Sequence, residues 1–414
     1  MIQRDGAVQT ADTAASPTLG RLGLGVVLGA SLVVVLDFSI VNVALPALSV
    51  ALGVTTRTSE WVVTAYALTF GGLLVLGGRA SDFFGRRRML LAGLFVFALA
   101  SAAGGFATTL PMLAASRAIQ GAAAALVAPA ALSILTTSYP EGPARNRVLG
   151  YFGMTASAGF VVGLVAGGIL VDTVGWRGVF FVNVPVCLAL VLVGSKVLPT
   201  GTTTAGPRHL DLPGAALVTS GTGVLVYAPT VGTNDGWGSP AFVACILLSA
   251  LFLAAFLFVE RRSPQPLVPL QIFRHHTLVI GDALSGLLGM WVAGEVLVLS
   301  LYCQQVLGYS PLKSGLIAVP QGIGGLLRGL LGSRLLDRIG LRVFLAGNCL
   351  LAAVSGSALF RFPVTTHYPG LGIVLLAFGF GSTNVVFGST VAASTGVTNA
   401  EQGLAGALVN ATRQ

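Results

Sequence analysis

The chain has 414 residues, of which 54% are hydrophobic and only 9% are charged, and its formal net charge is +9. Soluble domains carry roughly 25% charged residues, so this composition excludes an ordinary soluble fold. The long uncharged runs lack the period-two alternation of a transmembrane β-barrel, and they predict an all-α polytopic membrane protein.

Hydropathy and length predict the membrane-spanning helices, because one span needs about 20 apolar residues. In chain order the predicted spans are 22–45, 59–78, 89–107, 111–137, 147–171, 178–197, 212–232, 240–259, 277–303, 311–332, 342–361 and 370–394. The polar segment 1–21 is expected to be an uncleaved cytoplasmic tail. A last apolar run begins at Gly403 and stops at Gln414, so we expect about 12 complete spans and a partial thirteenth.

The distribution of basic residues predicts the orientation. With the N-terminus inside, most of the 23 Lys and Arg residues fall in cytoplasmic segments, as the positive-inside rule requires. Arginines dispersed over loops at the membrane edge suit anionic lipid and not nucleic acid. We therefore expect a lipid bilayer as partner, a cytoplasmic N-terminus and no nucleic acid.

One short segment occurs twice. Residues Gly77 to Arg87 recur 255 residues later as Gly332 to Arg342, with matches at Gly, Arg, Asp, Gly and Arg. Internal repeats are typical of secondary transporters, whose site lies between the related halves. The offset predicts a six-helix half at 22–197, two inserted linker helices at 198–262, and a second half at 263–414 that is incomplete.

Several separate motifs accompany the repeat. The first span contains Leu-Asp-Phe-Ser-Ile-Val-Asn-Val-Ala-Leu-Pro at residues 36–46, and the fourth contains Arg117-Ala-Ile-Gln120-Gly121. The loop after the second span carries Gly78, Asp82, Gly85, Arg86 and Arg87, and its repeat carries Asp337, Arg338 and Gly340. The fifth span carries a series of glycines, Gly150, Gly159, Gly163, Gly167 and Gly168.

These motifs resemble those of the major facilitator superfamily and, within it, the fourteen-span drug:proton antiporters. The resemblance covers nearly the whole chain, although Leu164 and Phe83 stand where the family usually has proline and a basic residue. It implies a two-half helical bundle that works as a proton-coupled antiporter and exports small lipophilic compounds. It also implies that the two loop motifs are cytoplasmic latches, the alternative being a topology signal alone, and that the helix-five glycines belong to an antiporter motif. Small-residue packing alone also explains such glycines.

Asp37 and Arg117 are the strongest candidates for proton coupling. Each lies roughly 9–12 Å below the outer surface, counted along helices that run in opposite directions, so we expect a direct or water-bridged contact. Protonation of Asp37 would loosen this pair, whereas the alternative is a static pair that only fixes packing. Glu295 lies three residues past the repeat equivalent of Asp37. It is expected to bind a cationic substrate or a second proton, the alternative being a helix cap in contact with water.

The remaining patterns exclude other functions. The sequence has no phosphate-binding GxxxxGK[ST] loop, no HExxH and no GxSxG, so neither an enzyme nor a primary pump is expected. The four His and four Cys residues lack metal-ligand spacing, and we expect no metal and no cofactor. Abundant arginine favours a bacterial cytoplasmic membrane, and a monomer is expected. A same-fold transporter of a polar metabolite and a truncated, non-transporting remnant remain alternatives.

Overall fold

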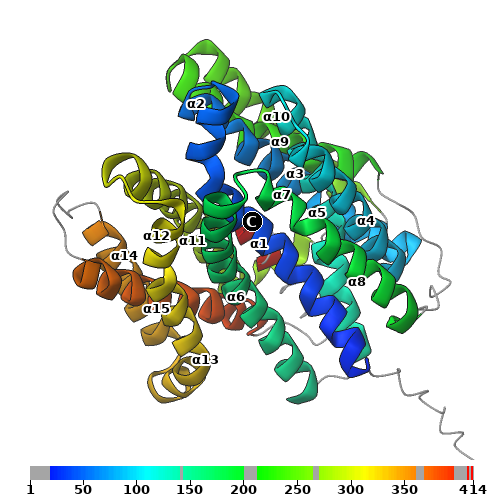
Figure 1. The fold of residues 1–414 in the computed structure, drawn as a ribbon. Coiled ribbons are helices and arrows are strands. Elements are labelled where there is room, and N and C mark those ends of the chain that lie inside the picture. Colours follow the sequence, from blue (N-terminus) through cyan, green and yellow to red (C-terminus); the bar gives the residue numbers. More distant parts are fainter. Residues whose placement is uncertain are drawn as a thin grey trace, which may run out of the picture.

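The computed structural model describes residues 19–139, 143–199, 212–263, 270–359 and 368–395, together with 408–409 and 412–413. These residues form helices and no strand (Figure 1). The first part of the chain contains α1 (Arg21–Leu52), α2 (Thr56–Ser59), α3 (Trp61–Phe84), α4 (Arg86–Gly105), α5 (Leu110–Ser138), α6 (Pro143–Thr173), α7 (Gly178–Phe181), α8 (Asn183–Val197), α9 (Leu212–Asp235) and α10 (Pro240–Arg262). The second part contains η1 (Leu270–Arg274), α11 (His276–Leu301), the π-helical turn η2 (Tyr302–Val306), α12 (Pro311–Ile317), α13 (Val319–Ile339), α14 (Leu341–Leu359) and α15 (Tyr368–Ser394).

Every predicted span coincides with a long helix or with two consecutive ones. The span 178–197 is divided into α7 and α8, and the span 311–332 into α12 and α13. Within the described residues, 9 helices are long and apolar enough to cross a membrane. The prediction of an all-α polytopic membrane protein is therefore confirmed. Most of the predicted tail 1–21 and most of the partial span 403–414 lie outside the described residues.

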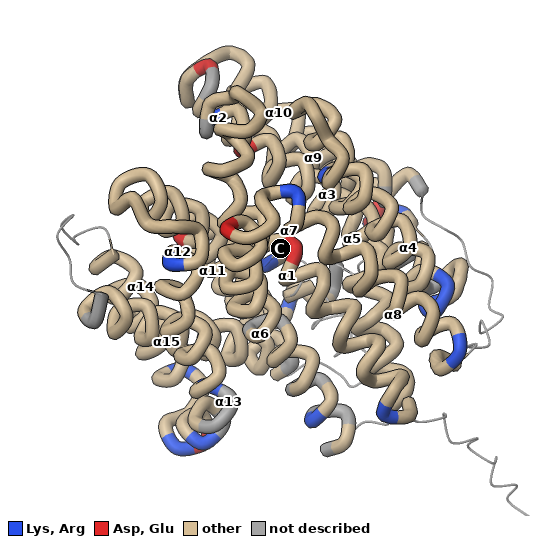
Figure 2. The backbone as a smooth tube through the Cα atoms, viewed as in Figure 1, with Lys and Arg blue, Asp and Glu red and all other residues tan. Residues whose placement is uncertain are grey.

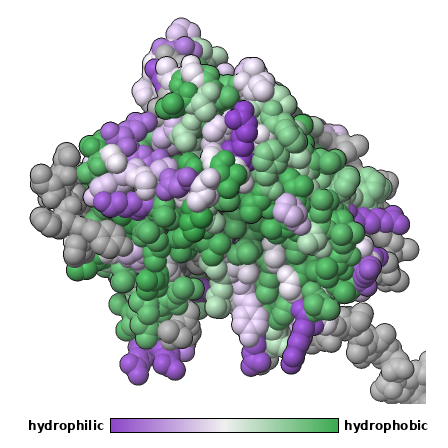
Figure 3. Space-filling model, viewed as in Figure 1, coloured by the Kyte–Doolittle hydropathy of each residue, from purple (hydrophilic) through white to green (hydrophobic). Residues whose placement is uncertain are grey.

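The surface is apolar around the middle of the molecule. Figure 3 shows a hydrophobic band across this face, with hydrophilic residues gathered mainly at the lower margin and the upper part. Large aliphatic side chains stand on the outside of the helices, such as Leu251 on α10 at 63% exposure and Leu350 on α14 at 65%. A hydrocarbon solvent accounts for such residues, since water would not favour their exposure.

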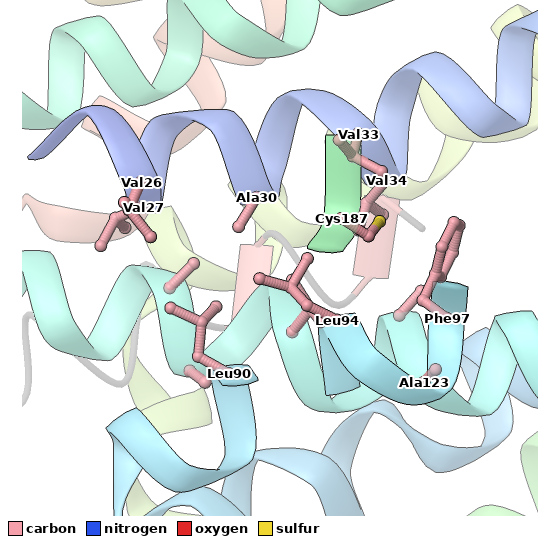
Figure 4. Close-up of a cluster of buried hydrophobic side chains, with 14 of the residues drawn as sticks. Val26, Val27, Ala30, Val33, Val34, Leu90, Leu94, Phe97, Ala123 and Cys187 are labelled. Atoms are coloured by element: carbon pink, nitrogen blue, oxygen red, sulfur yellow. The ribbon is translucent and has the colours of Figure 1, made fainter. Parts of the chain in front are cut away.

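The core of the first half lies where α1, α4, α5 and α8 meet (Figure 4). Small residues such as Ala30 and Ala123 let these helices approach closely, while Leu94 and Phe97 fill the space between them. Cys187 belongs to the same cluster and is a free thiol, in keeping with a packing role. The packed core gives the first half a rigid frame on which polar side chains can be positioned.

The two copies of the repeated segment have the same local structure. Gly85 separates α3 from α4 with φ 99°, and Gly340 separates α13 from α14 with φ 75°. Each glycine donates its backbone N–H to a carbonyl four residues earlier, Ser81 at 3.1 Å and Leu336 at 2.9 Å. A left-handed backbone favours glycine because it lacks Cβ. The repeated sequence segment thus forms the same kind of turn in both places.

The two halves meet at one end of the bundle. We call the end at which α1 finishes, uppermost in Figure 1, the upper end, and the end that carries the Gly85 and Gly340 turns the lower end. Helices α1 and α6 contact α11, α12 and α13. Lys and Arg residues gather along the lower and right-hand margin in Figure 2, at the lower end of the bundle.

Helices α9 and α10 pack as a pair on the side of the first half. Residue Tyr227 of α9 lies against Trp61 of α3, with ring centroids 5.8 Å apart. Phe256 of α10 packs against Leu76 of α3. The pair is therefore attached mainly through α3.

Candidate functional site

Asp37 forms the centre of a buried polar network in the first half. Its side chain has no exposed surface and makes an ion pair with Arg117 of α5, whose Nη1 donates to Oδ2. The other carboxylate oxygen, Oδ1, accepts hydrogen bonds from Gln120 Nε2 at 3.2 Å and from Asn183 Nδ2 at 2.7 Å. Three helices, α1, α5 and α8, thus meet at one carboxylate.

Arg117 is held in place by groups other than Asp37. Its Nε donates to the carbonyl of Val62 at 3.0 Å, and its Nη1 also donates to Gln120 Oε1 at 3.0 Å. The guanidinium carbon lies 4.3 Å from the centroid of the Tyr66 ring, a distance suited to a cation–π contact. Gln120 in turn donates to Ser101 Oγ at 2.7 Å, so the network extends to α4.

The network stabilises both charges only while both are present. Breaking a buried pair by removing one charge costs about 3–5 kcal/mol, since the other charge is left without compensation. Protonation of Asp37 would leave the buried Arg117 cation without a compensating charge. A proton on Asp37 would therefore remove the ion pair that joins α1 to α5.

The structure places Asp37 and Arg117 together, as the depth argument predicted, while their part in transport stays a prediction. Sequence reasoning missed Gln120, Asn183 and Tyr66 as partners. Gln120 could have been found, because it lies three residues after Arg117 on the same helix face. Nothing in the local sequence of Asn183 points to Asp37.

Glu295 lies between the two halves. Its side chain is 9% exposed, and Oε2 accepts a hydrogen bond from Gln321 Nε2 of α13 at 3.0 Å. Glu295 Oε1 and Gln321 Oε1 are buried without a hydrogen-bond partner among the described residues. A small pocket beside them is lined by residues of α1, α6, α11, α12 and α13: Val43, Phe160, Leu164, Glu295, Val296, Leu299, Ser300, Ser314, Ala318 and Gln321. Glu295 thus faces the junction of the halves and does not cap a helix end.

The repeat shows how the halves differ. The equivalents of Asp37, Tyr66 and Arg117, 255 residues later, are Val292, Gln321 and Gly372. The acid of the second half is Glu295, three residues after Val292. The position equivalent to Arg117 is a glycine and carries no side chain. One half therefore contains a neutralised acid, and the other contains an acid paired with an amide in the described part of the chain.

The glycines of α6 lie at helix contacts. Cβ atoms added at Gly163 and Gly167 would lie 2.0 Å from Ser39 Oγ and 3.0 Å from an Ile40 side-chain carbon, so one face of α6 packs closely on α1. A Cβ at Gly168 would lie 2.5 Å from Leu312 Cα of α12, in the second half. Helix α6 is therefore part of the boundary between the halves. The surroundings of Gly150 lie outside the described features.

The loop motifs are only partly described. Arg87 Nη2 donates to the carbonyl of Ser195, in the last turn of α8, where helix carbonyls lack helical donors. The Asp82 side chain lies outside the described residues, and Asp337 and Arg338 are exposed. Gly78 would tolerate a Cβ, 3.8 Å from Pro129 Cβ. The latch role of these residues stays a prediction.

Comparison with known proteins gives a consistent family. The sequence profile described as Major Facilitator Superfamily matches residues 27–414. A puromycin resistance protein of Streptomyces alboniger is 39% identical over 401 residues, covering 95% of this chain and 78% of that protein. A cephamycin export protein of Amycolatopsis lactamdurans is 36% identical, covering 99% of this chain and 85% of that protein.

Solved structures agree on the fold. A peptide transporter in complex with sulfate is similar with a TM-score of 0.69 at 16% identity, covering 97% of this chain and 90% of that one. A D-xylose–proton symporter gives a TM-score of 0.62 at 16% identity, covering 94% and 86%. With a profile match over most of its length and two relatives above 35% identity, the chain belongs to the major facilitator superfamily.

Proposed function

We propose that the protein is a proton-coupled antiporter that exports small lipophilic compounds by alternating access between two helical halves. The relatives named for puromycin resistance and cephamycin export support efflux as the direction and lipophilic or antibiotic compounds as the substrate class. The observation that carries the proton step is the wholly buried Asp37, bonded by side chains of three different residues.

The coupling step follows from charge. A deprotonated Asp37 accepts all three hydrogen bonds and neutralises Arg117, so α1, α5 and α8 stay together. A proton on Asp37 removes that attraction and leaves the Arg117 cation buried, which favours a rearrangement that hydrates it. The proton gradient would drive export, because the proton binds Asp37 from the outside and is released to the inside as the substrate leaves.

Glu295 supplies a second acidic group at the junction of the halves. It is the side chain proposed to hold a cationic substrate or a second proton, since a buried carboxylate is stabilised by any positive charge that reaches it. The small pocket beside it is lined by aliphatic side chains from both halves and by the phenyl ring of Phe160 from α6.

The topology completes the proposal. The functional units are a six-helix half at 22–197, two linker helices at 198–262, and a second half at 263–414. The N-terminus is cytoplasmic in a bacterial cytoplasmic membrane, since basic residues concentrate at the lower end (Figure 2). The upper end then faces outward, and Arg87 and its neighbours lie on the cytoplasmic side as latches. The protein acts as a monomer.

The test is transport by reconstituted protein under an imposed pH gradient, with lipophilic cations and neutral antibiotics as substrates. Asp37→Asn is expected to bind substrate but to lose the acceleration of export by the gradient. The matched control is Asp235→Asn, which changes an exposed acid at the end of α9. Its export should respond to the pH gradient as that of the wild type does. An Asp37→Asn protein that responds fully to the gradient would refute the proton step.

A further inference from the structure

Pro46 interrupts the hydrogen-bond ladder of α1. Proline has no backbone N–H, so the carbonyl four residues earlier has no donor within its own helix. That carbonyl belongs to Asn42, whose side chain is 2% exposed. A buried carbonyl without a donor costs free energy, and the protein must satisfy it from elsewhere.

The donor comes from the other half of the protein. Ser300 Oγ of α11 donates to the Asn42 carbonyl at 3.0 Å. One turn further, Gln304 Nε2 donates to the Val43 carbonyl at 3.1 Å and to Ser300 Oγ at 3.1 Å. One side chain of α11 and one of the following turn η2 thus hold two consecutive carbonyls of α1.

Gln304 reaches α1 from a distorted part of its helix. It lies in the π-helical turn Tyr302–Val306, where Leu307 N–H bonds the Tyr302 carbonyl at 3.0 Å. A π turn contains one extra residue and shifts the side chains that follow it around the helix axis; such turns are frequent at functional sites. The irregularities of α1 and of α11 therefore meet each other.

These bonds lie on the upper side of the Glu295 pocket. Val43 and Ser300 line that pocket as well as taking part in the bonds. Nearby, the Leu312 backbone N–H donates to Asp172 Oδ2 at 3.2 Å, joining α12 to the upper end of α6. The halves are thus closed at the upper end.

We propose that Pro46, Asn42, Val43, Ser300 and Gln304 form an upper clasp that holds the halves together on the outward side and must break for the protein to open outward. The assignment of this end to the outward side rests on the proposed function, whereas the clasp itself does not. When the clasp breaks, the Asn42 carbonyl has no helical donor to return to, so water must hydrate it. Proline thereby makes the bond between the halves stronger than one to an ordinary helix carbonyl, which keeps its own partner.

The test measures opening directly. A reporter, Val296→Cys, replaces a pocket side chain that is 4% exposed, and its labelling by a membrane-impermeant maleimide is followed in right-side-out and inside-out vesicles. The same chain without Val296→Cys gives the background from the four native cysteines. Transport is not needed for this readout.

Ser300→Ala is expected to raise labelling from the outside by about threefold to tenfold, the effect of losing the one bond between the halves that Ser300 makes, since Gln304 keeps its bond to the Val43 carbonyl. Ser300→Thr should keep the wild-type rate. Ser355→Ala is the control, because within the described residues Ser355 bonds only carbonyls of its own helix, at 2.5 Å and 3.3 Å. Pro46→Ala restores a helical donor to Asn42, so adding Ser300→Ala to it should change labelling less than twofold.

Wild-type labelling in Ser300→Ala, or an equal effect of Ser300→Ala with and without Pro46, would overturn the clasp. An increase seen only in inside-out vesicles would support the clasp and refute the proposed orientation instead.

Discussion

Replacement of Gly163 by alanine tests whether the close contact of α6 and α1 is needed. A Cβ at Gly163 would lie 2.0 Å from Ser39 Oγ and 2.8 Å from the Leu36 carbonyl oxygen. The hydroxyl can rotate, but the carbonyl belongs to the α1 backbone, so the two helices must move apart. At Gly159 the nearest atom, the Leu32 carbonyl oxygen, lies 3.1 Å away, and at Gly153 nothing lies within 4 Å.

The expected magnitudes follow from these distances. Overpacking costs typically about 1–3 kcal/mol, while alanine in a helix interior gains up to about 1 kcal/mol over glycine. Gly163→Ala should therefore be destabilised by about 1–2 kcal/mol, Gly159→Ala should be nearly neutral, and Gly153→Ala should be neutral or stabilised by less than about 1 kcal/mol. The order matters more than the absolute values.

Thermal unfolding of the purified protein in detergent measures the order of stability of the three variants, with Gly153→Ala as the matched control on the same helix. A second assay follows the leak of protons into vesicles that hold the protein without substrate. A loosened α1–α6 contact should raise that leak in Gly163→Ala alone. Equal melting temperatures and equal leak for Gly163→Ala and Gly153→Ala would show that the helices do not touch as described.

Two further substitutions address the second half and the repeat. Glu295→Gln keeps a hydrogen-bonding side chain but removes the charge, so the half-saturating concentration should rise about tenfold for lipophilic cations and less than twofold for neutral compounds. The control is Glu60→Gln, at the residue that precedes α3. Equal changes for both classes of compound in a transport assay would count against a cation site. Gly85→Ala and Gly340→Ala place Cβ on a left-handed backbone and should each lower the unfolding free energy by about 1–2 kcal/mol. The control is Gly347→Ala, whose Cβ would have no atom within 4 Å, and it should not lower that free energy. An unchanged melting temperature for either turn variant would argue against the shared turn geometry.

The sequence predicts those contacts that depend on one helix or on simple depth. Asp37 and Arg117 could be paired because antiparallel helices place residues at calculable depths, and Gly85 and Gly340 could be paired through the repeat. Asn183 could not be found in this way, because its position depends on the break between α7 and α8 that orients it towards Asp37.

Glu295 illustrates a second kind of limit. Hydropathy places it near the outer end of a span, where contact with water is expected. In the structure the helix continues into the turn Tyr302–Val306, and α12 and α13 pack beside it, so the carboxylate is buried. The donor to the Asn42 carbonyl is equally invisible in the sequence, because Ser300 approaches that carbonyl only in the folded protein.

The lateral pair of α9 and α10 has a consequence for the direction of the helices that follow it. In the proposed topology α9 and α10 add two crossings between the halves, and an even number of crossings lets every later helix keep its direction through the membrane. A single added helix would have inverted that half. Because the pair is attached mainly through α3, it can move with the first half as one body, apart from the boundary where α1 and α6 meet the second half.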